Sequence, residues 1–403
     1  MRYRHSLLSI IGLVICAGLA ACSNNSITAQ PSATAGATST PTLPPTPAGP
    51  LITRPLSTIQ MISTSVGWGV TQYDANTPQQ VTYTTDGGLS WHDVTPSAYS
   101  SGSGTLVLFA RSATEAWASI NTVPFSNATT SPMWHTTNGG QSWQSGTINT
   151  GGVNQITFVD QQHGWIAAAP GGHGAGQMPI DVWSTTDGGA SWAKTSQSTP
   201  VLGVTQGITF LTTTTGWAAA SASGAILEFS RTQDGGKTWT PQSLPAPVPN
   251  FSSFGETTVY PPVFTSTTNG ILFVGLIGGA QGSPTIPYRT TNGGATWAVG
   301  PKVGVGGCVW SVIADGTAFA GCGESSSMNG TLPRDLFSLP AGGSQWSPIT
   351  VDANSKPLTV GMSALDMVTA TVGWAITQSG LIHTTNGGQT WTLQLSATGV
   401  PGS

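Results

Sequence analysis

The stretch TTDGGLSW, residues 84–91, turns on two adjacent glycines and ends in a tryptophan. Related stretches recur along the chain, and their closing tryptophans are 45 to 58 residues apart. Seven copies occur, namely TTDGGLSW (84–91), TTNGGQSW (136–143), TTDGGASW (185–192), TQDGGKTW (232–239), TTNGGATW (290–297), the degenerate LPAGGSQW (339–346) and TTNGGQTW (384–391). A repeat of this length indicates a solenoid, a propeller or an array of small units.

Each copy follows a second recurring element, exemplified by MISTSVGWGV (61–70) and FVDQQHGWIA (158–167). This element has the pattern strand, polar turn, strand, and the glycine pair then indicates a turn between two further strands. Four strands in each of seven units predict an all-β fold, a seven-bladed β-propeller of four-stranded antiparallel blades, over residues 51–403.

The chemistry of the glycine-rich stretch suits a turn. An Asp or Asn side chain can accept hydrogen bonds from backbone N–H groups just ahead of it, and glycine adopts positive φ without a steric penalty. A general acid could not be replaced by Asn in three copies and by Ala341 in another. We therefore predict structural roles for Asp86, Asn138, Asp187, Asp234, Asn292 and Asn386. The tryptophans Trp91, Trp143, Trp192, Trp239, Trp297, Trp346 and Trp391 are expected to enter the outer strands and pack between sheets.

The pattern Ser/Thr-x-Asp/Asn-x-Gly-x-Ser/Thr-Trp resembles the Asp-box of the bacterial neuraminidase repeat. Together with the upstream Gly-Trp-Ala element, it makes the chain most similar to the photosystem II stability/assembly factor family. The resemblance implies a propeller that binds a protein partner through a basic patch and has no catalytic activity. Arg231 and Arg289 precede two boxes, but the other copies carry Tyr83, His135, Ser184, Ser338 and His383 at that position. Most of the basic patch is therefore absent, and Asp-box propellers also include sialidases and xyloglucan-active glycosidases.

The N-terminus is typical of an export signal. Arg2 and Arg4 precede the apolar run SLLSIIGLVICAGLAA (6–21), which is short for a membrane span. The run ends in LAAC (19–22), which resembles the lipobox of bacterial lipoproteins and implies a signal peptide over 1–21 and lipidation of Cys22. The alternative is an ordinary signal peptide cut after small residues. Residues 23–50 hold six prolines and no charge, so 22–50 is expected to be the lipidated Cys and a disordered tether. The predicted location is the extracytoplasmic face of the cell membrane.

Charge composition argues against a nucleic-acid partner, and histidine spacing argues against a metal site. Charged residues make up 6% of the chain, and no basic surplus is available to neutralise phosphates, which argues against nucleic acid. The histidines His92, His135, His163, His173 and His383 show no metal-ligand spacing, so neither a metal nor a cofactor is expected. We expect a monomer.

Loop lengths predict which face binds a ligand. The second loop of each unit varies most, at residues 121–132, 169–181, 276–287 and 321–335, and the longest crossover spans 248–262. Variable loops on a rigid scaffold commonly carry binding sites, although they can also be tolerated insertions. In the crossover, Phe251, Phe254 and Tyr260 could stack on a sugar, anchor a protein, or fold back over the channel mouth.

Catalysis would need groups that the sequence does not clearly assemble. A glycosidase uses two carboxyl groups across a cleft, and the candidates on the variable loops are Asp181, Glu256, Glu324 and Asp335, which no spacing pairs. A sialidase needs three arginines at one site, and only five follow the signal peptide. The sequence therefore predicts binding of a protein or an envelope glycan without catalysis, with a secreted glycoside hydrolase as the alternative.

Cys308 and Cys322 flank a predicted hairpin that turns at Asp315. A turn centred there places the two cysteines opposite each other, where a disulfide can form. We expect the disulfide, which an exported location would preserve; the alternative is two buried free thiols.

Overall fold

The computed structural model describes residues 44–47, 49–74, 76–99, 104–121, 129–150, 152–168, 180–196, 201, 203–278, 283–303, 308–322, 335–352 and 362–399. The chain divides into two units, Met1–Leu43 and Pro44–Ser403, and every described residue belongs to the second. The predicted signal peptide and Cys22 therefore lie outside the described residues. Within the described ranges, no helix has the length and apolar character needed to cross a membrane.

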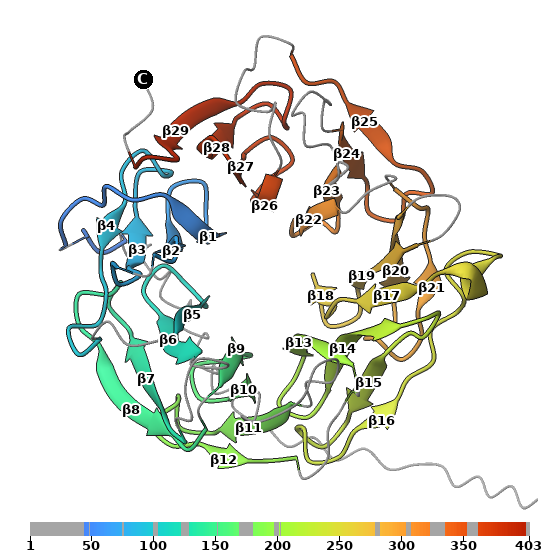
Figure 1. Cartoon of the computed structure of the whole chain (residues 1–403), viewed down its shortest axis with the longest axis horizontal. Coiled ribbons are helices and arrows are strands. Elements are labelled where there is room, and N and C mark those ends of the chain that lie inside the picture. The colour runs from blue at the N-terminus through green and yellow to red at the C-terminus, as the bar shows by residue number, and fades with distance from the viewer. Residues whose placement is uncertain are drawn as a thin grey trace, which may run out of the picture. The chain divides into compact units, whose positions relative to one another are not determined.

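The second unit consists of small antiparallel sheets arranged around a ring, with the first strand of each sheet innermost (Figure 1). Blade 1 contains β1 (Leu56–Met61), β2 (Gly67–Thr71), β3 (Val81–Thr84) and β4 (His92–Asp93). Blade 2 contains β5 (Thr105–Ala110), β6 (Ala116–Asn121), β7 (Ser131–Thr136) and β8 (Gln144–Ile148). Blade 3 contains β9 (Val153–Phe158), β10 (Gly164–Ala168), β11 (Asp181–Thr185) and β12 (Ala193–Lys194).

The remaining blades follow the same order of strands. Blade 4 contains β13 (Val204–Phe210), β14 (Gly216–Ser223), β15 (Phe229–Thr232) and β16 (Thr240–Pro241). Blade 5 contains β18 (Val263–Phe264), β19 (Gly270–Ile277), β20 (Thr285–Thr290) and β21 (Ala298–Val299). Blade 6 contains β22 (Cys308–Val312), β23 (Ala318–Cys322), β24 (Asp335–Leu339) and β25 (Ser347–Ile349). Blade 7 contains β26 (Met362–Met367), β27 (Gly373–Thr377), β28 (Gly380–Thr384) and β29 (Thr392–Ser396).

Blades 4 and 5 are joined, which the repeats did not predict. The crossover between them, expected to be loop, forms the 3₁₀ turn η1 (Phe251–Ser253) and the strand β17 (Glu256–Val259). β17 pairs with the end of β14 on one side and the end of β19 on the other, so the two blades form one nine-stranded sheet. The pairing is possible because β14 and β19 are each eight residues long, three more than β2, β10 or β27.

The core lies between blades rather than within them. Buried apolar residues form seven clusters, and each cluster is shared by two consecutive blades. The second strand of a blade is accordingly covered on both faces, and every residue of β2, β10 and β27 is buried. A strand that is buried on both faces has a continuous apolar sequence instead of an alternating one. This explains the recurring Gly-Trp-Ala element.

Each box turn is held by its own side chains. Thr84 Oγ1 donates to Asp86 Oδ1 at 2.8 Å and accepts the Gly88 N–H at 3.0 Å. Asp86 Oδ1 also accepts the Ser90 N–H at 2.9 Å. The same three bonds recur at Asn138, Asp187, Asp234, Asn292 and Asn386. The accepted N–H lies four residues ahead, further than a simple Asx-turn reaches.

Asp and Asn are interchangeable in this turn for a visible reason. The second oxygen of Asp187 accepts from the Ser191 hydroxyl at 2.5 Å, whereas Asn138 Nδ2 donates to the Ser142 hydroxyl at 2.8 Å. A hydroxyl can serve either role by rotating its hydrogen. Although desolvation raises the pKa of Asp187, these hydrogen bonds lower it to about 2. The box carboxylates are therefore engaged in hydrogen bonds within their own turns.

The box tryptophans lie one residue before the outer strand rather than within it. Trp91 precedes β4 and shares a cluster with Trp374 of blade 7. Trp143 Nε1 donates to the Val94 carbonyl of blade 1 at 2.7 Å. These contacts confirm the predicted packing between sheets, with each box tryptophan directed at the preceding blade.

The second-strand tryptophans point the other way, to the following blade. Trp117 Nε1 of blade 2 donates to the box carbonyl of Gly188 in blade 3 at 2.8 Å. Trp165 makes the same bond to Gly235 of blade 4 at 2.9 Å. These two buried indoles are therefore hydrogen-bonded across a blade interface, which satisfies their N–H donors.

The same contacts close the ring between blades 7 and 1. Trp374 Nε1 donates to the Gly87 carbonyl of blade 1 at 2.9 Å. The Met61 N–H of β1 donates to Asp366 Oδ2 of β26 at 2.7 Å. No strand is shared across this interface in the described residues, because all four strands of blade 1 and all four of blade 7 are consecutive in sequence. Among the described residues, packing and side chain–backbone hydrogen bonds, rather than a shared strand, join the first blade to the last.

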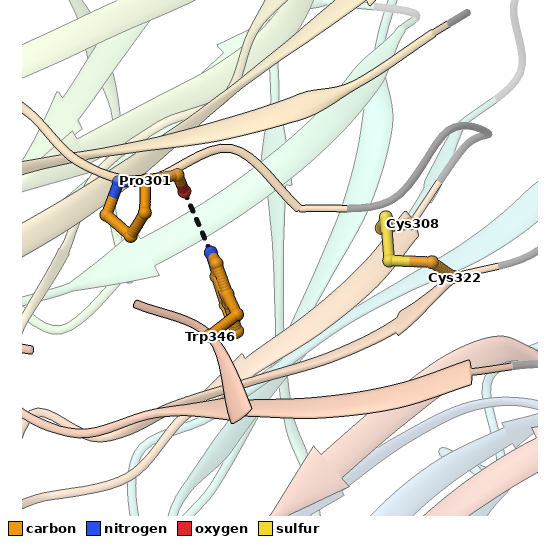
Figure 2. Close-up of a disulfide and its surroundings, with 4 residues drawn as sticks. All are labelled: Pro301, Cys308, Cys322 and Trp346. Atoms are coloured by element: carbon orange, nitrogen blue, oxygen red, sulfur yellow. Dashed lines mark hydrogen bonds between the residues drawn. A yellow bond between two sulfur atoms is a disulfide. The ribbon is translucent and has the colours of Figure 1, made fainter. Parts of the chain in front are cut away.

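The predicted disulfide is present in blade 6 (Figure 2). Cys308 and Cys322 are directly opposed in the β22–β23 pair, with their Cα atoms 4.2 Å apart. Figure 2 also shows Trp346 Nε1 of this blade donating to the Pro301 carbonyl at 2.8 Å. Blade 6, whose box lacks an Asp or Asn, is thus held by a covalent link in addition to its core contacts.

The predicted tether extends too far. Residues 44–47, 49 and 50 were assigned to it, yet they belong to the folded unit. The Pro50 carbonyl accepts the Asp93 N–H at 2.8 Å along the outer edge of blade 1. The Thr46 carbonyl accepts from Gln141 Nε2 at 3.2 Å in the blade 2 box. Backbone carbonyls of a proline-rich segment can accept hydrogen bonds even where its N–H donors are missing.

Candidate functional site

The two faces of the ring differ in construction. In blade 1, Gly87, the residue after the box Asp86, donates its N–H to the carbonyl of Ser65 at 2.8 Å. Ser65 lies in the first turn of the blade, between β1 and β2. The equivalent bond joins Gly139 to Thr114, Gly188 to Gln162, Gly235 to Thr214, Gly293 to Thr268, and Gly387 to Thr371. The first turns and box turns therefore share one face, here called the box face. The opposite face, the loop-rich face, carries the second loops and the crossovers between blades.

Two adjoining hollows open where the inner strands begin on the loop-rich face. Their volumes are about 360 Å³ and 380 Å³, and both are lined by Asn121, the last residue of β6, and Asn154 of β9. Asn121 Nδ2 donates to Asn154 Oδ1 at 2.9 Å. Thr205 and Gln206 of β13 complete the second hollow. We call this pair of hollows the inner-rim site.

The chemistry of the inner-rim site is neutral. Its described lining combines amide and hydroxyl side chains with apolar ones, and none of those described residues is ionisable. Gln60 and Gln155 are already used between blades, because Gln60 Oε1 accepts the Ala110 N–H at 3.0 Å and Gln155 Oε1 accepts the Ile208 N–H at 2.7 Å. Such a site can donate and accept hydrogen bonds but cannot transfer a proton at neutral pH.

The predicted carboxylates do not form a pair among the described residues. Asp181 begins β11 and accepts from Lys194 Nζ at 2.8 Å, so its charge is already matched. Glu256 begins β17, between blades 4 and 5, and its side chain is exposed. Glu324 and the side chain of Asp335 lie outside the described residues. The described ranges contain no cluster of three His, Cys, Asp or Glu side chains that could hold a metal.

Known structures share this architecture. No protein-family model and no curated protein matches the chain. The structure of YCF48 bound to D1 peptide superposes with a TM-score of 0.53 at 16% identity, covering 86% of this chain and 99% of that chain. The GH74 xyloglucanase from Xanthomonas campestris gives 0.53 at 13% identity over 84% of this chain and 54% of that chain. YCF48 from Cyanidioschyzon merolae gives 0.50 at 15% identity over 73% and 85%.

The fold is a β-propeller. At these identities the likeness establishes the fold alone, because one fold supports many unrelated functions. Function has to be read from the sites of this propeller.

The predicted aromatic contacts are part of the propeller's core. Phe254 is only 6% exposed and belongs to the cluster between blades 4 and 5, against which Phe251 also packs. Tyr260 lies edge-on to Trp310 of blade 6, with ring centroids 4.3 Å apart. These rings were expected to bind a ligand or cover the channel mouth. Their burial between blades corrects that expectation for Phe254 and ties Phe251 and Tyr260 to the scaffold.

A charged cluster on blade 2 was not predicted. Glu115 is 3% exposed, accepts from Arg111 Nε at 2.6 Å and lies 3.3 Å from His135 Nε2. His135 stacks on Trp117 with centroids 4.4 Å apart. Burial lowers the pKa of His135, and the Glu115 carboxylate opposes that effect. The signal in the sequence is Glu115 itself, which replaces the uncharged Val66 of blade 1 at the same place in the repeat.

Proposed function

We propose that this protein is a binding module, without catalytic activity, that engages a protein or an envelope glycan through its loop-rich face. The observation that supports the proposal most is the inner-rim site, where Asn121 and Asn154 present amides in a hollow whose described residues include no ionisable side chain. Asp181, the carboxylate predicted on the second loop of blade 3, is engaged in a salt bridge with Lys194. A similar propeller, YCF48, has been solved with a bound peptide.

The proposal includes export and a lipid anchor on Cys22. Its support is the apolar run at 6–21, whose last three residues begin the LAAC stretch at 19–22. A Cys22→Ser variant is expected to lose the lipid and to be released from membranes in soluble form. Mass spectrometry of the mature N-terminus checks this. An unmodified Cys22, or cleavage at another residue, would contradict the lipoprotein assignment and leave the binding proposal standing. The anchored protein is proposed to be a monomer.

The binding role is tested by a panel of peptides and glycans with purified protein. An Asn121→Ala/Asn154→Ala double variant is expected to weaken binding of the selected ligand by at least about tenfold, the loss of one to two hydrogen bonds. An Asn76→Ala variant, on the exposed second loop of blade 1, is the matched control and should bind normally. Binding that is unaffected by the double variant would place recognition elsewhere.

The alternative role, glycoside hydrolysis, has a direct readout in the same panel. Any released sugar would be followed in Asp181→Ala and Glu256→Ala variants. Hydrolysis that disappears in either variant would replace the binding proposal with catalysis. We expect no release by the wild-type protein.

A further inference from the structure

A larger groove lies on the box face, between blades 6 and 7. Its volume is about 890 Å³, within the range of small-molecule sites. One wall comes from the outer edge of blade 6 at residues 348–352, and the other from the blade 7 box at residues 386–390. Phe319 of β23 and Ser338 of β24 line it between these walls. None of these residues belongs to the inner-rim site.

The groove has a specific origin in the repeat. Blades 2, 3 and 7 each place a tryptophan against the box of the next blade, as Trp374 does when it donates to the Gly87 carbonyl. Blade 6 has Phe319 at this position, in TAFAG where blade 7 has VGWAI. A phenyl ring is smaller than an indole and has no N–H donor. Gly387, the blade 7 counterpart of Gly87, therefore lines an open space instead of receiving an indole.

The walls of the groove are fixed before any ligand arrives. The Asp352 N–H of blade 6 donates to the Gln389 carbonyl of blade 7 at 2.8 Å. Deeper in the same interface, Ser311 Oγ accepts the Met367 N–H at 2.9 Å. Asn386 is held by its own box turn. A site that is preformed in this way loses little conformational entropy on binding.

The lining is hydroxylic, with one carboxylate. The hydroxyls of Ser338 and Thr350 and the amide of Gln389 have no hydrogen-bond partner among the described residues. Pro348 and Ile349 contribute apolar surface, while Phe319 is 3% exposed and lies at the floor of the groove. Asp352 is the one charged side chain among the described residues of the lining, so nothing there balances the charge of an anionic ligand. The complementary ligand is uncharged, rich in hydroxyl groups, and has apolar C–H faces.

We propose that this groove binds a neutral oligosaccharide. The hydroxyl and amide groups of Ser338, Thr350 and Gln389 form hydrogen bonds with sugar hydroxyls, and Pro348 and Ile349 contact an apolar sugar face. The site is independent of the loop-rich face, so the propeller has a second, opposite surface for recognition.

Filling the groove with the residue used in other blades tests the proposal. Phe319→Trp restores the tryptophan found at this position in blade 7 and should leave the fold intact. Gln389→Ala removes a donor at the rim, and Gln141→Ala, the same box position in blade 2, is the matched control. The probes are neutral gluco- and xylo-oligosaccharides, galacturonic acid oligomers and glucosamine oligomers, titrated calorimetrically into the full chain.

We expect the neutral oligomers to bind, with affinity reduced at least about tenfold by Phe319→Trp and by Gln389→Ala and unchanged by Gln141→Ala. The Gln389→Ala result keeps the test decisive if Phe319→Trp folds poorly. No binding of neutral oligomers, preference for either charged oligomer, or full binding by Gln389→Ala would overturn the proposal. Loss of this binding in the Asn121→Ala/Asn154→Ala variant would also overturn it, because the sugar site would then be the inner rim.

Discussion

Asp366 makes the closure of the ring dependent on pH. Its carboxyl group lies partly buried between β26 and β1, where it accepts the Met61 N–H. Desolvation raises the pKa of Asp366 from 3.8 to about 6, although the Met61 hydrogen bond acts in the opposite direction. The folded protein therefore holds this proton more tightly than the unfolded chain. Stability from this group is complete below about pH 4 and is lost as the pH rises through 6.

The magnitude follows from the two pKa values. The difference between 3.8 and about 6, at about 1.4 kcal/mol per pH unit, is at most about 3 kcal/mol. Asp366→Asn removes the titration and keeps an oxygen that can accept the Met61 N–H. We expect Asp366→Asn to be more stable than the wild type by about 1–3 kcal/mol at pH 7.5 and nearly equal to it at pH 3.

Urea denaturation at pH 3, 5 and 7.5 measures this difference directly. His383, whose pKa burial lowers, titrates in both proteins and cancels from the comparison. Asp160→Asn is a control of opposite sign: desolvation raises the pKa of Asp160, but hydrogen bonds centred on His163 lower it overall. That variant should lose stability at neutral pH. The reasoning would be refuted by an Asp366→Asn stability difference that does not change with pH, or by a less stable variant at pH 7.5.

Three further changes have defined outcomes. Asp187→Asn should be nearly neutral at pH 7, because Asn138 makes the same turn, whereas Asp187→Ala should cost about 1–2 kcal/mol in chemical denaturation. Replacing both Cys308 and Cys322 with Ala should lower the free energy of unfolding by about 3 kcal/mol, because the disulfide closes a loop with a sequence separation of 14 residues. Reduction of the wild type should give a similar loss. An unchanged free energy of unfolding would show that the disulfide does not stabilise the fold. Trp374→Phe should lower the free energy of unfolding by about 1–3 kcal/mol, through a lost indole hydrogen bond and a cavity, and a thermal melt should show a lower midpoint.

The blades could be predicted because the hydrogen bonds of each regular box turn join residues that are close in sequence. The bonds that define a box, from Thr84 to Ser90, lie within seven residues, and the same spacing returns in each regular copy. The opposed cysteines followed from hairpin symmetry in the same way. A local pattern that repeats in sequence reports directly on geometry that repeats in space.

What the sequence did not predict depends on contacts between distant segments. β17 pairs with residues 221–223 and 274–277, and its own sequence does not predict those partners. Phe254 was expected to bind a ligand or fold back over the channel mouth because it stands in a crossover, yet it is buried by strands of blades 4 and 5. The groove between blades 6 and 7 did have a signal, the change of Trp to Phe319. Its meaning became clear once Trp374 was seen to fill the equivalent place.

The end of blade 7 meets the segment that leads into β1. The backbone of Gly399 lies so close to the Thr53 carbonyl that a Cβ on Gly399 would overlap it. Since blades 1 and 7 exchange no described strand, a short peptide joining residue 399 to residue 53 would leave every four-stranded sheet whole. A circularly permuted chain, reopened in the exposed stretch before η1, should therefore fold to the same ring, and the order in which the blades are translated is free to change without altering the finished molecule.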